Sequence, residues 1–341
     1  MIYLQKFVIY IFLGLSLFLQ IFASSANAQP MSEPITLKVP TFPTMGSAQF
    51  FIAEEEGFFA EQGLQIKYVD ITRSTEALPA LVQGKIDVLH GVMSIGFLNA
   101  IARGGKVKFV ADKGYLPSAG CAYNALLARR ALAEAEKPGN PIQLKGRRIA
   151  INPASIEAYY VEKFLSTVGL TLNDVMIVDI PTPVIPEALE KGAIDFAATT
   201  EPWVTRILEA KQGVIWTSIN QVIPDFQFAF LLYGPTLIEK NPEIGKRFMV
   251  AYLRAVREYN QGKTDRNLKI IAKRIGLEEE FLKKVCWSPH RNSGEINIRS
   301  VLDFQTWGIK KGFIEKENSP DQFWDPRFVD YANKVLSTPK K

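Results

Sequence analysis

Four stretches of this sequence place small polar residues at the predicted start of a helix, where a polar ligand can be held. The first backbone N–H groups of a helix lack partners within the helix, and the helix dipole favours negative charge. The candidate residues are Met45, Gly46, Ser47 and Gln49; Ser74 and Thr75; His90, Gly91 and Ser94; and Asn152 and Ser155. The alternative is that each serine only caps its helix, which stabilises that helix by about 1 kcal/mol.

A carboxylate and an indole stand at the start of a further predicted helix. Glu201 and Trp203 flank a proline and follow a polar pair that ends with Thr200. A carboxylate beside an indole suits a ligand with an N–H donor and a flat or apolar body, so we place these three residues in the ligand site. The alternative is that Glu201 stabilises the helix N-terminus and Trp203 packs in the core.

Two tyrosines and a histidine complete the candidate ligand site. Tyr115 and Tyr159 are amphipathic aromatic residues near predicted cleft loops, although each could equally pack in a core. His90 follows an apolar strand, where its ring could bind a ligand or have a structural role. His290 is predicted at the surface. Two histidines without a HExxH or Cys/His pattern predict neither a metal site nor a cofactor.

Two aspartates repeat one local pattern, in which glycine, any residue, isoleucine and aspartate precede an apolar residue. Asp87 and Asp195 occupy the same place in the two copies. Such a pair invites general acid–base chemistry, but the flanking isoleucines and the predicted strands favour a structural role. No GxSxG, P-loop or GxGxxG motif follows a strand, so we predict no catalytic residue and no enzymatic activity.

Short strands alternate with helices along the chain, and this alternation predicts the elements that position these residues. Apolar strand patterns and amphipathic helix patterns alternate from 35 to 111 and again from 125 to 217. They predict an α/β fold of two lobes, each a mostly parallel sheet flanked by helices. The predicted divisions are residues 29–117 for lobe 1, 118–228 for lobe 2 and 229–341 for a mostly helical part that completes lobe 1.

The N-terminus is typical of an export signal. Lys6 is the only charge of residues 1–28, an apolar run from Phe7 to Phe22 follows, and Ala26-Asn27-Ala28 fits a signal-peptidase site. We therefore predict a cleavable signal peptide over residues 1–28 and a periplasmic protein. The alternative is an uncleaved membrane anchor, because the apolar run is almost long enough to span a bilayer.

Composition excludes several classes of function. The chain has 341 residues, 47% of them hydrophobic and 22% charged, and a formal net charge of +5. Lysine and arginine are spread along the chain, so binding to nucleic acid is not indicated. Cys121 and Cys286 are the only cysteines. They could pair in an oxidising compartment, but two separate buried thiols are the preferred interpretation.

Several short motifs recur in the order and spacing of a known family. They are Glu56-Gly57-Phe58-Phe59-Ala60-Glu61-Gln62-Gly63-Leu64, Gly84-Lys85-Ile86-Asp87-Val88, Asn99-Ala100-Ile101-Ala102-Arg103-Gly104, Leu144-Lys145-Gly146-Arg147-Arg148-Ile149-Ala150, Ala193-Ile194-Asp195-Phe196 and Glu201-Pro202-Trp203. With these motifs the chain resembles the substrate-binding proteins of ABC importers. The branch it resembles includes the aliphatic-sulfonate, taurine and nitrate binding proteins and those for thiamine-pyrimidine precursors.

This resemblance implies a periplasmic-binding-protein-like type II fold that crosses twice between lobes and closes over one small solute. The implied partners are an ABC permease and its ATPase in the inner membrane, and we expect a monomer. Enzymes related to the thiamine-pyrimidine branch have a cysteine-rich run. Only Cys121 stands in that region, so their activity is not supported.

The identity of the solute stays open at this point. Helix N-termini favour an anionic head group, whereas Glu201 favours a neutral or N–H-bearing ligand, and we prefer a neutral or zwitterionic organic solute. Two other functions are compatible with the fold: a pyrimidine-precursor synthase or dehydratase, and a ligand sensor that binds a signalling partner.

Overall fold

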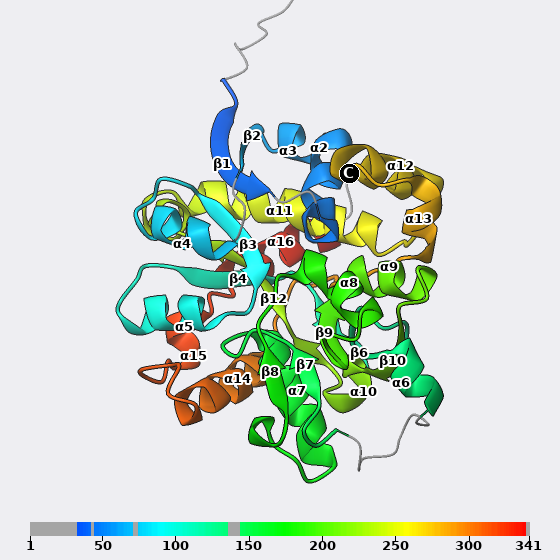
Figure 1. Cartoon of the computed structure of the whole chain (residues 1–341). Helices are drawn as coiled ribbons and strands as arrows, with labels where there is room; N and C mark the ends of the chain where they lie inside the picture. Colours follow the sequence, from blue (N-terminus) through cyan, green and yellow to red (C-terminus); the bar gives the residue numbers. More distant parts are fainter. Residues whose placement is uncertain (1–32, 42–43, 71–73, 136–143, 339–341) are drawn as a thin grey trace, which may run out of the picture. The chain divides into compact units, whose positions relative to one another are not determined.

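Two groups of strands organise the protein (Figure 1). The computed structural model describes residues 33–41, 44–70, 74–135 and 144–338. The predicted signal peptide, residues 1–28, lies outside this described part. Within the described part, no helix combines the length and the apolar character needed to cross a membrane.

Lobe 1 contains the first four strands of the chain and the last one, β12. β1 pairs with β2 in parallel, and β12 lies between β3 and β4, antiparallel to both. The Asp87 amide donates to the Lys38 carbonyl over 3.0 Å, which joins β1 to the segment before β3. The strands are β1 (Ile35–Thr41), β2 (Leu64–Asp70), β3 (Val88–Val92), β4 (Lys108–Asp112) and β12 (Ala229–Tyr233). The helices are η1 (Met45–Ser47), α2 (Ala48–Glu55), α3 (Phe58–Glu61), α4 (Ser74–Val82) and α5 (Ile95–Ala102).

Lobe 2 holds one five-stranded sheet of order β10-β6-β9-β7-β8. β7 is parallel to β8 and β9, whereas β6 is antiparallel to β9 and β10. The strands are β6 (Asn124–Arg129), β7 (Arg148–Ala150), β8 (Met176–Val178), β9 (Phe196–Thr200) and β10 (Gly213–Ser218). The helices are α6 (Arg130–Ala135), α7 (Ile156–Thr167), η3 (Leu172–Asp174), η4 (Thr182–Val184), α8 (Ile185–Glu190), α9 (Trp203–Glu209) and α10 (Ile219–Val222).

The two lobes therefore share one arrangement. In each, a single antiparallel strand, β12 or β6, lies between the third and fourth strands of a parallel set. The chain passes between the lobes through β5 (Tyr115–Leu116) and returns through β11 (Phe226–Gln227), and these two strands pair in antiparallel fashion. The predicted α/β fold of two lobes with two crossings is confirmed, while the residue boundaries assigned to each part stay predictions.

The C-terminal part is mostly helical, as predicted. It contains the π-helical turn η5 (Thr236–Lys240) and the helices α11 (Pro242–Tyr259), α12 (Asp265–Ile275), α13 (Glu279–Lys284), α14 (Ile298–Lys310), α15 (Pro320–Phe323) and α16 (Arg327–Ser337). α11 buries Phe248, Tyr252 and Val256, which recur every four residues, and packs against α2 and α16 of the same core.

α14 of this part also contacts lobe 2, and the assignment of residues 229–341 to lobe 1 stays a prediction. The Trp307 indole donates to the Glu162 carboxylate of α7 over 2.7 Å, and Lys311 pairs with the same carboxylate at 2.8 Å. The aromatic rings of α14 also pack on Tyr159 of α7. α14 therefore contacts α7 of lobe 2 as well as α5 of lobe 1.

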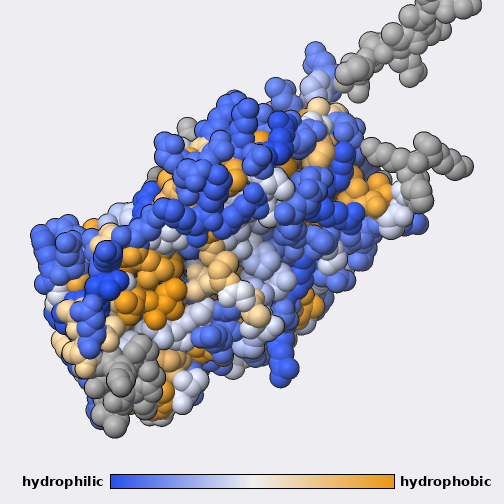
Figure 2. Space-filling model, turned by 90° about the vertical axis from the view of Figure 1, so that its right-hand side faces the viewer, coloured by the Kyte–Doolittle hydropathy of each residue, from blue (hydrophilic) through white to orange (hydrophobic). Residues whose placement is uncertain are grey.

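Hydrophobic side chains lie mainly in the interior of the described part. On the face in Figure 2 hydrophilic residues predominate, with hydrophobic residues gathered in a few patches. One cluster of buried side chains includes Phe97 and Phe109 of lobe 1 together with Tyr159 and Phe196 of lobe 2. The lobes therefore share part of their hydrophobic core.

Several predicted boundaries differ from the observed ones. β3 continues to Val92 and β9 to Thr200, so His90, Gly91 and Thr200 lie in strands and not in the predicted loops. Pro79 lies in the middle of α4 and not in its first turn, because α4 already begins at Ser74. Both strands are extended by pairing with an antiparallel neighbour, which local sequence does not reveal.

Candidate functional site

A pocket of about 140 Å³ lies at the ends of β7 and β9 in lobe 2. Ten residues line it: Ala150, Ile151, Asn152, Glu157, Ile180, Thr182, Ile185, Ala198, Thr199 and Thr200. β7 and β9 are parallel neighbours, so the residues that follow both strands meet at one edge of the sheet. The structure thus brings the predicted residues Asn152 and Thr200 together.

The loop before α7 is held by its own polar side chains. Ser155 Oγ accepts a hydrogen bond from Ala158 N at 3.3 Å and donates to the Asn152 carbonyl at 2.8 Å. Asn152 accepts from Ala154 N at 3.0 Å and donates to the Asp179 carboxylate at 3.2 Å. Ser155 is therefore a helix cap, and the exposed Asn152 is fixed in position beside the pocket.

Glu157 lines the same pocket, and the sequence analysis did not select it. It is half-buried in the first turn of α7. Burial raises the pKa of its carboxyl, and interactions with its own backbone and with Ser155 oppose part of this rise. Its position two residues after the capping serine is the sequence signal that could have identified it.

The predicted residues of lobe 1 surround a buried lysine. Lys113 follows β4, is 4% exposed, and donates to the carbonyl of Gly46 and to the side-chain oxygen of Gln49. His90 Nε2 lies 3.4 Å from Ser47 Oγ, and Gln49 Nε2 lies 3.4 Å from His290 Nδ1. These side chains form a buried polar cluster, which we call the Lys113 cluster.

Burial changes the protonation of the Lys113 cluster. Desolvation lowers the pKa of Lys113 to about 7, with Asp112 acting in the opposite direction. Burial, and then the Lys113 charge, lower the pKa of His90 and His290 well below the ordinary value, so both imidazoles are neutral at pH 7.

The predicted surface position of His290 is wrong. His290 is 5% exposed, and its backbone amide donates to the side chain of Asn260 at the end of α11. Segment 285–297 between α13 and α14 carries it into the Lys113 cluster, 241 residues from Gln49 in sequence. A contact over that separation leaves no local signal in the sequence.

The remaining predicted residues of lobe 1 have separate places. Met45 is buried, Gly91 pairs with Phe230 across β3 and β12, and Ser94 caps α5 by accepting from Phe97 N at 3.3 Å. Ser74 and Thr75 begin α4, but their side chains lie outside the described part.

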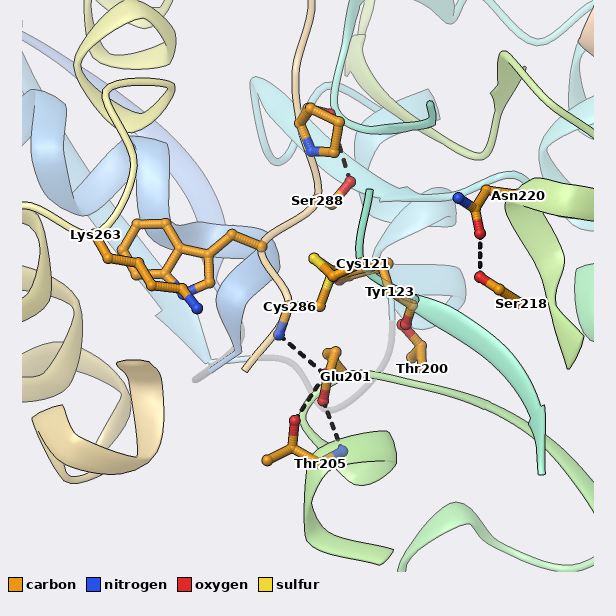
Figure 3. The surroundings of a disulfide bond; sticks show 12 residues. Cys121, Tyr123, Thr200, Glu201, Thr205, Ser218, Asn220, Lys263, Cys286 and Ser288 are labelled. Atoms are coloured by element: carbon orange, nitrogen blue, oxygen red, sulfur yellow. Dashed lines mark hydrogen bonds between the residues drawn. A yellow bond between two sulfur atoms is a disulfide. The ribbon is translucent and has the colours of Figure 1, made fainter. Parts of the chain in front are cut away.

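A disulfide joins Cys121, in the segment between β5 and β6, to Cys286 (Figure 3). The preferred prediction of two separate thiols is therefore wrong. The Cα atoms lie 5.7 Å apart although 165 residues separate them in sequence. Segment 285–297 returns to the crossover and brings the two cysteines together, which spacing alone could not predict.

Glu201 is bound within the protein at this junction. Its carboxylate accepts from Thr205 N at 3.0 Å, Thr205 Oγ1 at 2.8 Å and Cys286 N at 3.0 Å (Figure 3). Burial raises the pKa of this carboxyl, and these hydrogen bonds offset part of the effect. The carboxylate thus links the first turn of α9 to segment 285–297 through hydrogen bonds. Trp203 is half-buried, with the Arg206 guanidinium 4.8 Å from the centre of its ring.

The two predicted tyrosines have different surroundings. Tyr115 lines a second pocket, of about 280 Å³, together with both cysteines, Tyr123 and Trp287. Tyr159 is 1% exposed and packs against Phe226, as part of the core shared by the lobes. Tyr115 therefore lines a pocket, whereas Tyr159 lines neither this pocket nor the pocket of lobe 2.

The two repeated aspartates brace strands. Asp87 accepts from Lys38 N at 2.8 Å, and Asp195 accepts from Arg148 N at 3.0 Å. Asp195 also accepts from the Arg148 guanidinium at 3.0 and 3.1 Å. The structural role predicted for both is confirmed. Among the described residues, no three of the His, Cys, Asp and Glu type lie together in a way that could hold a metal ion.

The fold is that of a two-lobed binding protein. One lobe has a polar pocket at its strand ends, the other has the buried Lys113 cluster, and the chain crosses between them twice. The chain belongs to the NMT1-like family, whose sequence profile matches residues 31–276. No curated protein matches the sequence.

Solved structures share this fold at low sequence identity. The periplasmic aliphatic sulphonate binding protein SsuA from Escherichia coli has a TM-score of 0.69 and 17% identity, covering 86% of this chain and 92% of its own. The periplasmic nitrate-binding protein NrtA from Synechocystis PCC 6803 has a TM-score of 0.68 and 15% identity, covering 90% of each chain. The desulfurization enzyme DSZB has a TM-score of 0.62 and 13% identity, covering 89% of this chain and 99% of its own.

Proposed function

We propose that this protein is the solute-binding component of an ABC importer. It captures a small organic solute between its two lobes and delivers it to a permease with its ATPase. The observation that carries the proposal is the matched pair of lobes, each with helix starts and polar residues after its parallel strands, joined by the paired crossovers β5 and β11. Membership of the NMT1-like family and the likeness to SsuA and NrtA support it.

In this proposal the lobes have unequal tasks. The pocket of lobe 2, with Asn152 and Thr200, takes the solute first, because its polar groups line open space. The Lys113 cluster of lobe 1 then covers the solute as the crossovers bend. A solute that contacts both lobes shifts the equilibrium towards the closed form by its differential affinity for that form.

The proposal includes the cellular setting that the sequence predicts. The N-terminal 28 residues direct export, and the mature protein acts as a periplasmic monomer. The likeness to two periplasmic binding proteins supports this location.

The proposal assigns no catalysis to the protein. The chain contains two cysteines, and both are joined in the disulfide, so no thiolate is free to act as a nucleophile in the oxidised protein. The likeness to DSZB concerns the fold. Conversion of a bound solute into a new product, followed by mass spectrometry, would contradict this part of the proposal.

A thermal-shift panel tests the proposed function. Sulfonates, taurine, nitrate, pyrimidines and related heterocycles are added to the folded protein, and a true ligand at 100 times its Kd adds about 2.7 kcal/mol of stability. Asn152→Ala should reduce the affinity for that ligand, whereas Asn173→Ala, at an exposed asparagine outside the pocket, should not. If no small molecule stabilises the folded protein, the proposal fails.

A further inference from the structure

The pocket of lobe 2 is lined by one acidic side chain and by no basic one. Glu157 is the one ionisable residue among the ten that line it. A second carboxylate, Asp179, is held beside the pocket by the Asn152 amide at 3.2 Å. No lysine or arginine of the described part forms a salt bridge with Glu157, and nearby positive charge does not contribute to its pKa shift.

Glu157 also occupies the place where α7 would otherwise attract an anion. α7 has 12 residues, and its first-turn N–H groups and its dipole favour a negative group at this end. Glu157 supplies that group from the chain itself, in contact with its own backbone and with Ser155. Glu157 thus occupies the helix start, and an anion in the same pocket would be repelled by its carboxylate.

The other polar groups of the pocket suit a small planar head group. Thr182, Thr199 and Thr200 line the same space, and a threonine hydroxyl can accept an N–H donor. A volume of about 140 Å³ admits one small group and leaves the body of a larger solute outside. A carboxylate binds a planar group with two parallel N–H donors through two hydrogen bonds at once, which is the strongest arrangement open to it.

We infer that this pocket takes the amidine- or guanidine-like end of an organic solute and excludes sulfonates and nitrate. The inference rests on the proposed function and specifies the chemical class of its solute. It separates this chain by chemistry from SsuA and NrtA, which are named for a sulphonate and for nitrate. Glu157 is the residue that sets this selectivity.

Three probes with the same phenyl body test the inference: benzamidine, benzamide and benzenesulfonate. Calorimetry or ligand-observed NMR on the folded mature protein should give the order benzamidine, then benzamide, with no binding of benzenesulfonate at millimolar concentration. We expect at least about a tenfold preference for benzamidine over benzamide, because only benzamidine offers a charged pair to Glu157.

Matched variants assign the effect to one carboxylate. Glu157→Gln should remove most of the preference for benzamidine, while Glu157→Asp, which keeps the charge, should still exclude benzenesulfonate. Glu187→Gln is the control, because Glu187 stands in the first turn of the neighbouring α8, is exposed and does not line the pocket. Circular dichroism and the thermal midpoint establish that each variant is folded.

The outcomes separate the inference from the proposed function. Equal affinity for the three probes, a preference for benzenesulfonate, or unchanged selectivity in Glu157→Gln overturns the inference. If benzamidine fails to bind while a sulfonate or nitrate stabilises the protein, the inference fails and the proposed function stands. If no solute of any class stabilises the protein, both fail.

Discussion

In lobe 1, the polar side chains near the ends of β1, β3 and β4 are buried against one another around Lys113, whereas in lobe 2 those near the ends of β7 and β9 line a pocket. In each lobe one antiparallel strand lies between two parallel ones, and an aspartate braces a parallel strand, β1 in lobe 1 and β7 in lobe 2. One strand arrangement thus supports the buried Lys113 cluster in lobe 1 and an open polar pocket in lobe 2. The lobes differ in whether the ionisable side chain, Lys113 or Glu157, is enclosed in a polar cluster or lines a pocket.

Loss of the disulfide should have the largest effect, because it ties the crossover from lobe 1 to lobe 2 to segment 285–297. The bond spans 165 residues, and constraints on long loops restrict the unfolded chain most. We expect the double variant Cys121→Ser, Cys286→Ser to lose about 2–5 kcal/mol in urea unfolding. The control is the wild-type protein in reductant, which should lose as much. An unchanged midpoint would mean that other contacts hold the crossover.

The two bracing aspartates allow a direct test of the lobes against each other. Asp195 is 5% exposed and binds both the backbone and the guanidinium of Arg148, whereas Asp87 binds the backbone of Lys38. Asp195→Asn should cost about 2–3 kcal/mol, and Asp87→Asn about 1 kcal/mol, because asparagine keeps one acceptor oxygen. Chemical denaturation of both variants measures the difference. Equal losses would mean that the guanidinium adds nothing.

Acid should abolish the stabilisation that Asp195 provides. Burial alone raises the pKa of Asp195, but hydrogen bonds from Arg148 and its charge lower it below the ordinary value. The stabilisation is therefore complete above the ordinary aspartate pKa and is lost as the pH falls through the lowered one. Denaturation of wild type and Asp195→Asn should give converging stabilities as the pH falls below about 4.

A further predicted effect is the pH dependence of stability caused by the Lys113 cluster. Burial lowers the pKa of Lys113 to about 7, so above that pH the unfolded chain holds a proton that the folded protein has released. Stability should then rise with pH by about 1.4 kcal/mol per unit between about pH 7 and pH 10 from this group alone. Lys113→Met should remove this rise, and Lys106→Met, at an exposed lysine, should keep it. An unchanged slope in Lys113→Met would contradict the assignment.

The sequence predicted much of the fold because its signals are local. Apolar strand patterns, glycine stops and serine caps such as Ser94 and Ser155 each depend on residues a few positions apart. The repeated Ile-Asp pattern even marked equivalent places in the two lobes, where both aspartates brace strands. The ends of β3 and β9 were missed because antiparallel partners far along the chain extend them.

The site was less predictable, since its decisive contacts join distant residues. Gln49 meets Lys113 at a separation of 64 residues and His290 at 241. The bond from Cys286 N to Glu201 exists only because segment 285–297 returns to the junction. Glu157 does have a local signal, because it is the acidic residue in the first turn after the capping Ser155.

The position of β12 has a consequence for synthesis. β3 and β4 each pair with β12, which is reached only at Ala229, after every strand of lobe 2 has been made. Lobe 2 is continuous in sequence from β6 to β10, so its sheet can assemble as soon as β10 is available. The lobe that begins first along the chain is therefore the lobe that is completed last, and its central pairing positions stay open to other strands until Tyr233 has emerged.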